Sequence, residues 1–255
     1  MTDFSTYKLN EVLNKSLKSI NFKTPTPIQE KSIPLILQGN DILGSAQTGT
    51  GKTAAFCIPI LELLMKSSRG SLLIMIPTRE LAKQVLDVID SLLGFKSSIN
   101  TATLIGGESM SKQLSQLKKR PRIYVGTPGR INDHLQRGTL NLHDTKYLVL
   151  DETDRMLDMG FEVQINKIIK FLPINKQVLM FSATIPDNIL KMSSKYLNNP
   201  IRISVGDSNS VAKNIKQEII ELKSDEKLDE LVNQLSTRTG SVLIFVKTKY
   251  GTEKL

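Results

Sequence analysis

A glycine-rich segment that ends in a lysine and a threonine carries the clearest chemistry in this sequence. It reads Ala46-Gln47-Thr48-Gly49-Thr50-Gly51-Lys52-Thr53 and follows an apolar pair, Ile42-Leu43. Glycines allow backbone N–H groups to turn toward phosphate oxygens, and a helix that begins near Thr53 would add the positive end of its dipole. Lys52 would contact the outer phosphates, and the Thr53 hydroxyl would bind Mg²⁺. The segment therefore predicts a nucleoside triphosphate site, although the usual pattern begins with Gly where this chain has Ala46.

Two carboxylates follow a buried apolar run further along the chain. Asp151 and Glu152 come directly after Tyr147–Leu150, which reads as a strand that ends where a bound nucleotide would lie. Asp151 would hold Mg²⁺ through its water shell, and Glu152 would orient and deprotonate an attacking water. The alternatives are a solvated acidic pair at a helix start and, for the glycine-rich segment, an ordinary turn. Together the two segments predict an ATPase site with Lys52, Asp151 and Glu152 as its catalytic residues.

The elements that must position these residues alternate between strands and helices. Segments with helical spacing, such as Glu80 to Leu93, separate short apolar runs of the kind that form strands buried on both faces. These runs are Leu72–Ile76, Thr101–Ile105, Ile123–Val125, Tyr147–Leu150, Val178–Phe181 and Val242–Val246. The alternation predicts an α/β fold with a mostly parallel, doubly wound sheet, in which the ligand binds at the carboxyl ends of the strands.

Composition limits the class of protein and its partners. The chain has 255 residues, of which 40% are hydrophobic, enough for one large core and part of another domain. Its net charge of +9 favours a polyanionic partner without choosing between RNA, DNA and an anionic membrane. The single cysteine, Cys57, excludes an internal disulfide and predicts a reducing, cytoplasmic setting. We expect no membrane association, because the sequence shows no signal peptide and no run of ~18 apolar residues.

An ordered series of short motifs extends the chemistry beyond these two segments. The acidic pair continues as Asp151-Glu152-Thr153-Asp154. The other motifs are Phe22-Lys23-Thr24-Pro25-Thr26-Pro27-Ile28-Gln29, Pro77-Thr78-Arg79-Glu80-Leu81, Gly106-Gly107, Thr127-Pro128-Gly129-Arg130 and Ser182-Ala183-Thr184. Taken in chain order, from about Phe4 to Thr248, the motifs resemble those of the DEAD-box RNA helicases. The resemblance implies a three-layer RecA-like P-loop NTPase domain that binds ATP, Mg²⁺ and RNA.

The segment before the glycine-rich loop resembles the adenine-reading Q motif of that family, here within residues 2–30. The Gln29 amide can donate and accept at once, so it matches adenine and rejects guanine. The resemblance implies that Phe22 stacks on the base and that Thr24 belongs to the nucleotide site. Asn21 stands where the family usually has Gly, a change that a left-handed backbone position would accept. Without the other motifs, Gln29 would read as an ordinary residue of a helix start.

The three motifs that follow buried strands resemble the RNA-backbone contacts of the family. They supply Pro77, Thr78, Arg79, Gly106, Gly107, Thr127, Pro128, Gly129 and Arg130. Arginine forks, threonine hydroxyls and backbone amides at helix starts suit phosphate, and none of these segments could read base edges in a major groove. The resemblance therefore implies sequence-independent binding of single-stranded RNA, with contacts to the 2′-OH selecting ribose. Taken singly, each motif would read as a turn before a capped helix.

Two further features concern the link between ATP and RNA. The resemblance implies that the hydroxyls of Ser182 and Thr184 bond to Asp154, which would couple the ATP site to the grip on RNA. Thr153 stands where the family usually has Ala. A buried hydroxyl at this position needs a partner, because leaving it unpaired costs ~1–3 kcal/mol. We expect Asp154 and the other two carboxylates to keep their geometry.

The resemblance divides the chain into three parts. Residues 1–205 form the helicase ATP-binding domain, 206–216 a polar linker, and 217–255 the truncated start of a second RecA-like domain. In that last part we expect strands at Gln217–Leu222 and Ser241–Val246 around a helix from about Asp225 to Leu235. The sequence has no HRxGRxGR-like segment. Because an arginine supplied in trans contributes ~10³–10⁵ in rate, we expect the chain to bind ATP but to hydrolyse it very slowly and not to unwind RNA.

Other functions stay open at this point. The chain could be a non-catalytic RNA- or partner-binding fragment that has lost the motor, or a remnant whose end from Asp225 to Leu255 stays partly disordered. A DNA-directed P-loop ATPase is a further alternative, against which Gln29 and Asp151–Asp154 argue. The sequence identifies neither the RNA target nor a ribonucleoprotein or ribosome-assembly partner.

Several other polar residues receive no functional assignment. His134 and His143 lack a second metal ligand nearby, so surface or cap roles are predicted. Cys57 is predicted to be a small buried hydrophobe. The basic run Lys118-Lys119-Arg120-Pro121-Arg122 is interpreted as a solvated helix end leading into a strand rather than as an RNA contact.

Overall fold

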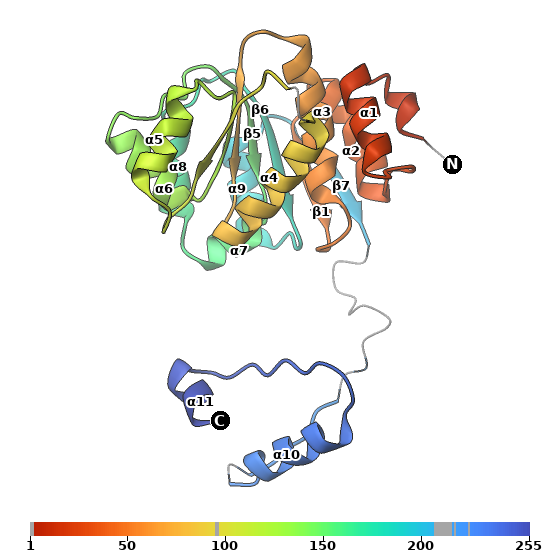
Figure 1. The fold of residues 1–255 in the computed structure, drawn as a ribbon, viewed down its shortest axis with the longest axis vertical. Coiled ribbons are helices and arrows are strands. Elements are labelled where there is room, and N and C mark those ends of the chain that lie inside the picture. The colour runs from red at the N-terminus through yellow and green to blue at the C-terminus, as the bar shows by residue number, and fades with distance from the viewer. Residues whose placement is uncertain (1–2, 95–96, 207–215, 217, 224) are drawn as a thin grey trace. The chain divides into compact units, whose positions relative to one another are not determined.

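The chain divides into two compact units, Met1–Asn209 and Ser210–Leu255, which are described separately below (Figure 1). The structure, a computed structural model, describes residues 3–94, 97–206, 216, 218–223 and 225–255. Most of the predicted linker at 206–216 therefore lies outside the described residues. Of the helices in the described ranges, none has both the length and the apolar character needed to cross a membrane.

The first unit is built on a seven-stranded sheet whose paired strands all run parallel. The strand order is β3-β4-β2-β5-β6-β1-β7. The strands are β1 Ile42–Ala46, β2 Ser71–Met75, β3 Thr101–Leu104, β4 Ile123–Gly126, β5 Thr145–Leu150, β6 Gln177–Ser182 and β7 Ile201–Val205. Because they point in one direction, their carboxyl ends meet at one edge, which we call the carboxyl edge. The predicted parallel, doubly wound sheet is confirmed.

The apolar runs predicted as strands in the first unit all form strands, with ends shifted by one or two residues. Strand β7 was not predicted. It alternates apolar residues with Arg202 and Ser204, a pattern typical of a half-buried strand rather than of a fully buried one. This pattern fits its place at the end of the sheet, where it pairs with β1.

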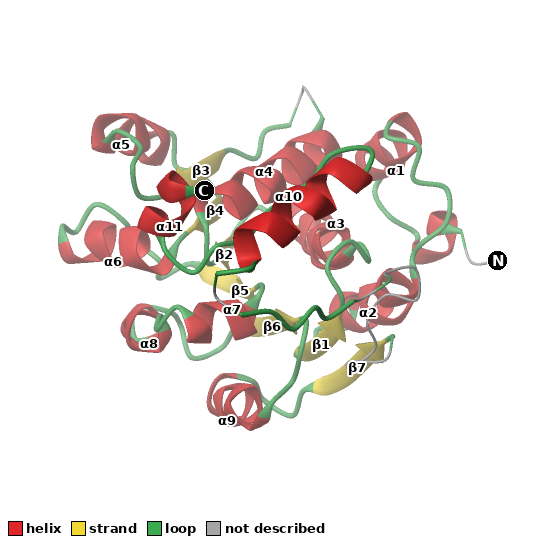
Figure 2. Cartoon of the chain, turned by 90° about the horizontal axis from the view of Figure 1, so that it is seen from below, coloured by secondary structure: helices red, strands yellow, loops and turns green. Residues whose placement is uncertain are grey.

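Helices connect the strands and cover both faces of the sheet. They are the short 3-10 helix η1 Phe4–Tyr7 and the α-helices α1 Glu11–Ser19, α2 Pro27–Leu37, α3 Lys52–Lys66, α4 Arg79–Leu93, α5 Met110–Lys118, α6 Pro128–Gln136, α7 Thr153–Asp158, α8 Glu162–Ile169 and α9 Asp187–Tyr196. Figure 2 shows α3 and α4 on one side of the sheet and α6, α8 and α9 on the other. The arrangement has the three layers implied by the resemblance.

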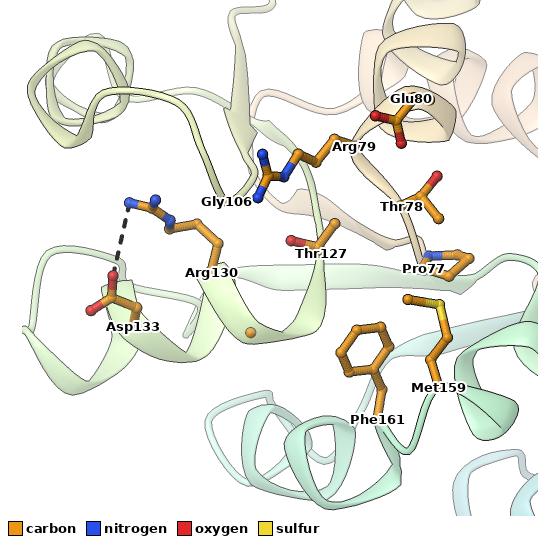
Figure 3. Close-up of a pocket in the computed structure, with 11 residues that line it drawn as sticks. Pro77, Thr78, Arg79, Glu80, Gly106, Thr127, Arg130, Asp133, Met159 and Phe161 are labelled. Carbon is orange, nitrogen blue, oxygen red and sulfur yellow. Dashed lines mark ion pairs between the residues drawn. The ribbon is translucent and has the colours of Figure 1, made fainter. Parts of the chain in front are cut away.

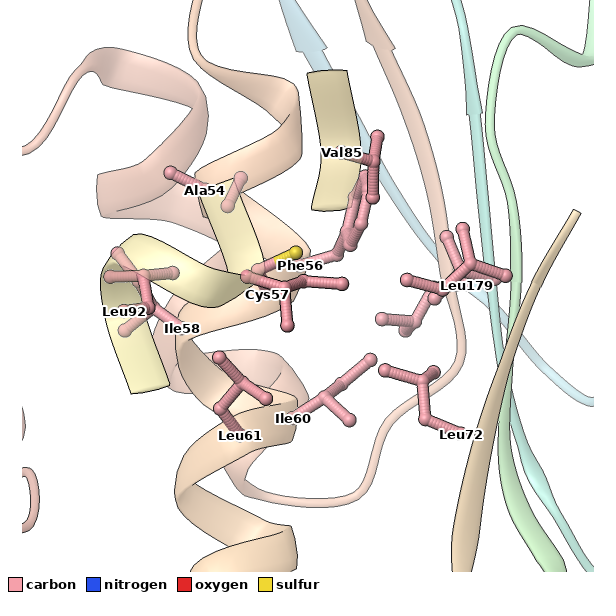
Figure 4. Packing of buried hydrophobic residues seen from close by; sticks show 14 of the residues in the cluster. Ala54, Phe56, Cys57, Ile58, Ile60, Leu61, Leu72, Val85, Leu92 and Leu179 are labelled. Carbon is pink, nitrogen blue, oxygen red and sulfur yellow. The ribbon is translucent and has the colours of Figure 1, made fainter. Parts of the chain in front are cut away.

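Each face of the sheet carries its own hydrophobic cluster. On the side of α3, Figure 4 shows Ile60 beside Leu72 of β2, and Phe56 and Leu179 of β6 belong to the same cluster. Cys57 is fully buried in the same cluster, so its predicted role as a small buried hydrophobe is confirmed. Burial of apolar surface on both faces is the main term that fixes helices to strands, and with them the turns at the carboxyl edge.

The second unit contains the helices α10 Lys227–Thr237 and α11 Lys249–Lys254. Helix α10 confirms the helix predicted there. The strands predicted at Gln217–Leu222 and Ser241–Val246 are wrong for residues 218–222 and 241–246, whereas Gln217 itself lies outside the described residues. A strand needs a neighbour to satisfy its backbone groups, and the described residues of this unit supply none. Leu243 and Phe245 are accordingly 79% and 88% exposed.

Candidate functional site

The glycine-rich segment forms the turn from β1 to α3. Gly49 and Gly51 have φ of +83° and +91°, a left-handed conformation that glycine adopts at little cost. Lys52 begins α3, is buried, and its Nζ donates to the Ala46 carbonyl at 2.7 Å. The turn thus holds the Lys52 ammonium at the start of a long helix, where a phosphate would meet both the charge and the helix dipole.

The remaining polar residues of this turn lie around its tip and the first turn of α3. The Thr50 hydroxyl donates to the Gln47 carbonyl at 2.7 Å, and Thr48 is exposed. Thr53 is the second residue of α3 and is half-buried. Thr53 therefore directly follows Lys52 in the first turn of this helix.

Gln29 connects the N-terminal helices to the glycine-rich turn. Its Oε1 accepts the Thr26 N–H at 3.0 Å, which caps α2, and its Nε2 donates to the Gly51 carbonyl at 3.0 Å. A Cβ on Gly51 would collide with the Gln29 amide, so this glycine is required by contact as well as by φ. The two bonds use one amide hydrogen and one oxygen lone pair, which leaves a second of each to recognise a base edge. The position of Gln29 in a helix start is therefore confirmed, and its recognition of adenine stays a prediction.

Phe22 lies exposed beside this helix start. Its ring stacks on Phe4, with centroids 6.2 Å apart and planes at 29°, and Phe4 is buried. Asn21 has φ of +61°, so the left-handed position predicted for it is confirmed. Thr24 is exposed in the turn between α1 and α2. One face of the Phe22 ring is supported by protein, and stacking on the base remains a prediction.

The acidic pair stands at the end of β5. Asp151 is buried, and its Oδ1 accepts the Glu152 N–H at 2.9 Å. Burial raises the pKa of Asp151 to about 6, and the nearby Lys52 ammonium opposes this rise. Glu152 has φ of +50° and its carboxylate is 3.4 Å from the Arg155 guanidinium. The turn after β1 and the end of β5 thus bring opposite charges together at the carboxyl edge.

The donor set at this edge fits magnesium. Asp151 and Thr53 offer a carboxylate and a hydroxyl, which are hard oxygen ligands of the kind that Mg²⁺ prefers. Throughout the described residues, no group of three or more His, Cys, Asp or Glu side chains could hold a metal ion. Magnesium usually keeps several waters and shares its remaining positions between one or two protein oxygens and the phosphates of a nucleotide, which this set permits.

Asp154 receives several hydrogen bonds from the turn after β6. Its Oδ2 accepts the Thr184 hydroxyl at 3.0 Å, the Thr184 N–H at 3.0 Å and the Ala183 N–H at 3.2 Å. Its own N–H donates to the Ser182 hydroxyl at 3.3 Å. Burial acts to raise the pKa of Asp154, but these bonds outweigh it and hold the pKa below its usual value. The acidic segment is therefore linked to Ser182-Ala183-Thr184 as the resemblance implies.

The Thr153 hydroxyl has hydrogen-bond partners in this structure. The side chain is fully buried, and its hydroxyl lies 3.1 Å from the Phe181 carbonyl and 3.3 Å from the Leu150 carbonyl. These carbonyls belong to the residues just before Ser182 and Asp151. The hydroxyl therefore ties the ends of β5 and β6 together, and no unpaired group arises where the family usually has Ala.

Thr153→Val, which keeps the shape but loses the hydroxyl, should destabilise the first unit. We expect its free energy of unfolding to fall by about 1–3 kcal/mol, because the buried carbonyls would face a methyl group. Thr153→Ser keeps the hydroxyl and should lose no more than about 1 kcal/mol, the value of one buried methyl. Urea unfolding followed by circular dichroism measures both variants. Wild-type stability in Thr153→Val would show that the hydroxyl contributes nothing.

Residues from four separate segments line a pocket of about 540 Å³ (Figure 3). We call it the arginine pocket, and its lining residues are Pro77, Thr78, Arg79, Glu80, Gly106, Thr127, Gly129, Arg130, Asp133, Met159 and Phe161. Figure 3 shows Arg79 beside Gly106, Arg130 directed toward Asp133, and Met159 near Phe161. The pocket therefore combines residues of all three motifs for which the resemblance implies RNA contacts.

Gly106 and Gly107 make room for the Arg79 guanidinium. A Cβ on Gly106 would lie 3.4 Å from Nη2 of Arg79, and a Cβ on Gly107 would overlap Nη1. Gly107 also has φ of +73°. Thr78 caps α4, since its hydroxyl accepts the Leu81 N–H at 3.3 Å, and this cap fixes the helix start that carries Arg79. The guanidinium thus lies against bare backbone at the wall of the pocket.

The other arginine of the pocket is held by helix α6 and its neighbours. Arg130 lies in the first turn of α6, after Thr127 at the N-cap and Pro128, which is buried. Its guanidinium donates to the Glu108 carbonyl at 3.4 Å and lies 3.8 Å from the Asp133 carboxylate. Both contacts are long, and the ion pair with the partly exposed Asp133 carboxylate is weak, so an anion could replace them.

Four lining residues were not predicted as part of a site: Glu80, Asp133, Met159 and Phe161. Met159 and Phe161 lie between α7 and α8, around Gly160 with φ of +74°. Met159 is 49% exposed. An apolar pair around a glycine was the available signal, but nothing local indicates that this turn faces the ends of β2 and β4.

The surface or cap role predicted for His134 is wrong. Its ring is fully buried, with Nε2 3.0 Å from Gln113 Oε1 and Nδ1 2.9 Å from Thr139 Oγ1. The partner Gln113 belongs to α5, and a contact between two helices cannot be inferred from spacing along one of them. His143 is exposed, as predicted.

The basic run after α5 behaves largely as predicted. Its first three residues, Lys118, Lys119 and Arg120, are exposed. The Arg122 guanidinium donates to the carbonyls of Gly70 at 2.9 Å and Leu64 at 3.0 Å. It therefore stabilises the end of α3 and the turn that follows, a structural role.

The sequence matches a known family and several named proteins. Residues 26–192 match the family model described as DEAD/DEAH box helicase. The chain is 42% identical over 257 residues to the ATP-dependent RNA helicase CshA of Listeria monocytogenes. It is 40% identical over 253 residues to the DEAD-box ATP-dependent RNA helicase RhpA of Helicobacter pylori. These matches cover 100% and 99% of this chain but 49% and 51% of the relatives, so the chain spans about half their length.

Solved structures agree with the fold. A crystal structure of a DEAD box protein from the hyperthermophile Methanococcus jannaschii matches with a TM-score of 0.76 and 39% identity, over 100% of this chain and 69% of that one. A hypothetical ATP-dependent RNA helicase from Sulfolobus tokodaii matches with a TM-score of 0.72 and 36% identity, over 77% and 57%. The parallel sheet with helices on both faces is therefore shared with these structures.

Proposed function

Because this chain belongs to the DEAD/DEAH box helicase family, we propose that it is the ATP- and RNA-binding half of an ATP-dependent RNA helicase. The chain spans about half the length of its curated relatives, so the activity of a whole helicase is part of this proposal. One observation supports it most: the turn that holds Lys52 and the turns that line the arginine pocket follow strands of one parallel sheet. Two anion-binding sites therefore share the carboxyl edge.

The ATP site uses residues from three parts of the chain. Lys52 neutralises the outer phosphates, and Gln29 reads the adenine edge with its remaining donor and acceptor. Asp151 and Thr53 hold magnesium, which would neutralise charge on the phosphates. Glu152 stands next to Asp151, where its carboxylate orients and deprotonates the attacking water.

The arginine pocket binds the backbone of single-stranded RNA. Arg79 and Arg130 provide guanidinium groups that fork onto phosphate, and the N-termini of α4 and α6 add backbone N–H groups. These are contacts to phosphate and sugar, which carry no base sequence. The link from Asp154 to Thr184 joins the ATP site to the turn after β6, and we propose that it relays the state of the nucleotide.

Arg79→Ala and Arg130→Ala should each weaken RNA binding by about tenfold or more, because each removes a charge-assisted bond to phosphate worth about 1.5–3 kcal/mol. Fluorescence anisotropy of a labelled oligouridine, titrated with the 255-residue chain at low salt, gives the Kd. Each variant should also show a shallower dependence of the Kd on salt, because fewer counterions are released.

Arg69→Ala is the matched control, since it removes the same charge from an exposed position just before the amino end of β2. It should leave the RNA affinity within about twofold of the wild type, as expected for a single screened surface charge. Equal losses of RNA affinity in all three variants would show that RNA binding depends on net charge alone, and would refute the arginine pocket as the binding site. Equal affinity for a DNA oligomer of the same length would refute ribose selectivity.

A further inference from the structure

We propose that His134 and Gln113 are positioning residues for RNA binding, because their buried hydrogen bond sets the spacing between the Gly106–Gly107 turn and helix α6. The turn and the helix contribute two walls of the arginine pocket. Neither His134 nor Gln113 lines the pocket, so both act through the residues that they hold. This inference rests on the proposed RNA-binding function of that pocket.

Gln113 also bonds to the backbone just before the Gly106–Gly107 turn. Gln113 is fully buried in α5, and its Nε2 donates to the Ile105 carbonyl at 2.8 Å. Ile105 immediately precedes Gly106. Because the amide nitrogen of Gln113 is the donor in this contact, its Oε1 is the atom that accepts from His134 at 3.0 Å. The Gly106–Gly107 turn, α5 and α6 are thus joined through two consecutive buried hydrogen bonds.

The same geometry determines which ring nitrogen of His134 carries the hydrogen. Nε2 must donate to Gln113, so Nδ1 is the acceptor and faces the Thr139 hydroxyl at 2.9 Å. Burial lowers the pKa of His134, and the nearby Arg130 charge acts in the same direction. The ring is therefore neutral at neutral pH, and the donor role of Nε2 is retained.

Helix α6 is joined to the segment after β3 at two places. Near solvent, the Arg130 guanidinium donates to the Glu108 carbonyl at 3.4 Å. One turn later on the same side of the helix, His134 makes its buried bond to Gln113. An RNA phosphate would compete for Arg130 and draw it from Glu108. The buried bond does not face the ligand, so it keeps α6 in place when the outer contact is exchanged.

His134→Leu and His134→Gln separate positioning from simple packing. Leu fills the space but leaves Gln113 Oε1 buried without a donor, whereas the amide nitrogen of Gln can replace Nε2. Gln177→Leu is the matched control, because it removes another buried amide, one that donates to the carbonyls of Ile36 at 3.0 Å and Asn40 at 2.7 Å. Gln177 begins β6, so it lies at the amino ends of the strands, away from the carboxyl edge.

The experiment measures two affinities on each variant of the 255-residue chain: labelled oligouridine by anisotropy and a fluorescent ATP analogue by titration. His134→Leu should weaken RNA binding by about tenfold and leave nucleotide affinity unchanged, a size typical of residues that act through others. His134→Gln should restore RNA affinity to within about threefold of the wild type, because it retains the donor. Gln177→Leu should leave RNA affinity unchanged.

Wild-type RNA affinity in His134→Leu, or an equal loss in His134→Gln or Gln177→Leu, would overturn the positioning role. If His134→Leu does not fold, His134→Asn gives the same comparison, since its amide reaches only the position of Nδ1. A loss of RNA affinity in Arg79→Ala without one in His134→Leu would overturn this inference and leave the proposed function standing. A wild-type chain that does not bind RNA overturns the proposed function, and this role with it.

Discussion

Lys52→Ala should reduce the affinity of the chain for ATP by about 10- to 100-fold, because hydrogen bonds to charged groups contribute about 1.5–3 kcal/mol. The Lys52 ammonium is buried at the start of α3 and is held by the Ala46 carbonyl, so little order must be created when a phosphate arrives. Alanine removes the charge and leaves the backbone of the turn intact. Titration of a fluorescent ATP analogue in the presence of magnesium measures the loss.

Lys83→Ala provides the control for Lys52. Lys83 is exposed on α4, so its removal changes the net charge equally without touching the turn from β1 to α3. Its ATP affinity should equal that of the wild type. Wild-type ATP binding by Lys52→Ala would mean that the glycine-rich segment is an ordinary turn, the alternative that the sequence left open.

Gly107→Ala should reduce RNA affinity by about tenfold or more, the cost of displacing a guanidinium from a phosphate contact. Two effects combine at this residue. A Cβ would overlap Nη1 of Arg79, and φ of +73° is unfavourable for any residue with a side chain. Arg79 must therefore leave its place beside the glycines or the turn must change shape. Anisotropy of labelled oligouridine measures the loss.

Gly138→Ala isolates the backbone effect. Gly138 has φ of +65°, close to that of Gly107, but a Cβ there would meet no atom within 4 Å. It should lose a similar amount of stability, about 1–2 kcal/mol, without losing RNA affinity. If Gly138→Ala impaired RNA binding as much as Gly107→Ala, the Arg79 contact would not be the cause.

The turns that form the proposed ATP site could be predicted from the sequence because the chemistry they would perform is local. Backbone amides around a phosphate require glycines and a helix start within a few residues, as in Gly49 to Thr53, and a metal-binding acid needs only the end of a buried strand, as in Asp151. The parallel sheet followed from the alternation of buried apolar runs with helical segments. Each of these patterns is complete within about twenty residues of chain, the length of a strand, turn and helix.

The remainder depends on which segments meet in space. Met159 and Phe161 gave no local sign that they face the ends of other strands, and the buried pair of His134 and Gln113 joins two helices. The strand predicted at Ser241–Val246 failed for the opposite reason. Its local pattern favours a strand, but the described residues of the second unit offer no neighbour to pair with it.

The most direct test titrates both ligands, the ATP analogue and oligouridine, into Lys52→Ala and Gly107→Ala. If two separate sites share the carboxyl edge, Lys52→Ala should lose ATP and keep RNA, whereas Gly107→Ala should lose RNA and keep ATP. Loss of both ligands in folded samples of both variants, or of neither ligand in either variant, would contradict the assignment of this chain as the ATP- and RNA-binding half of a helicase.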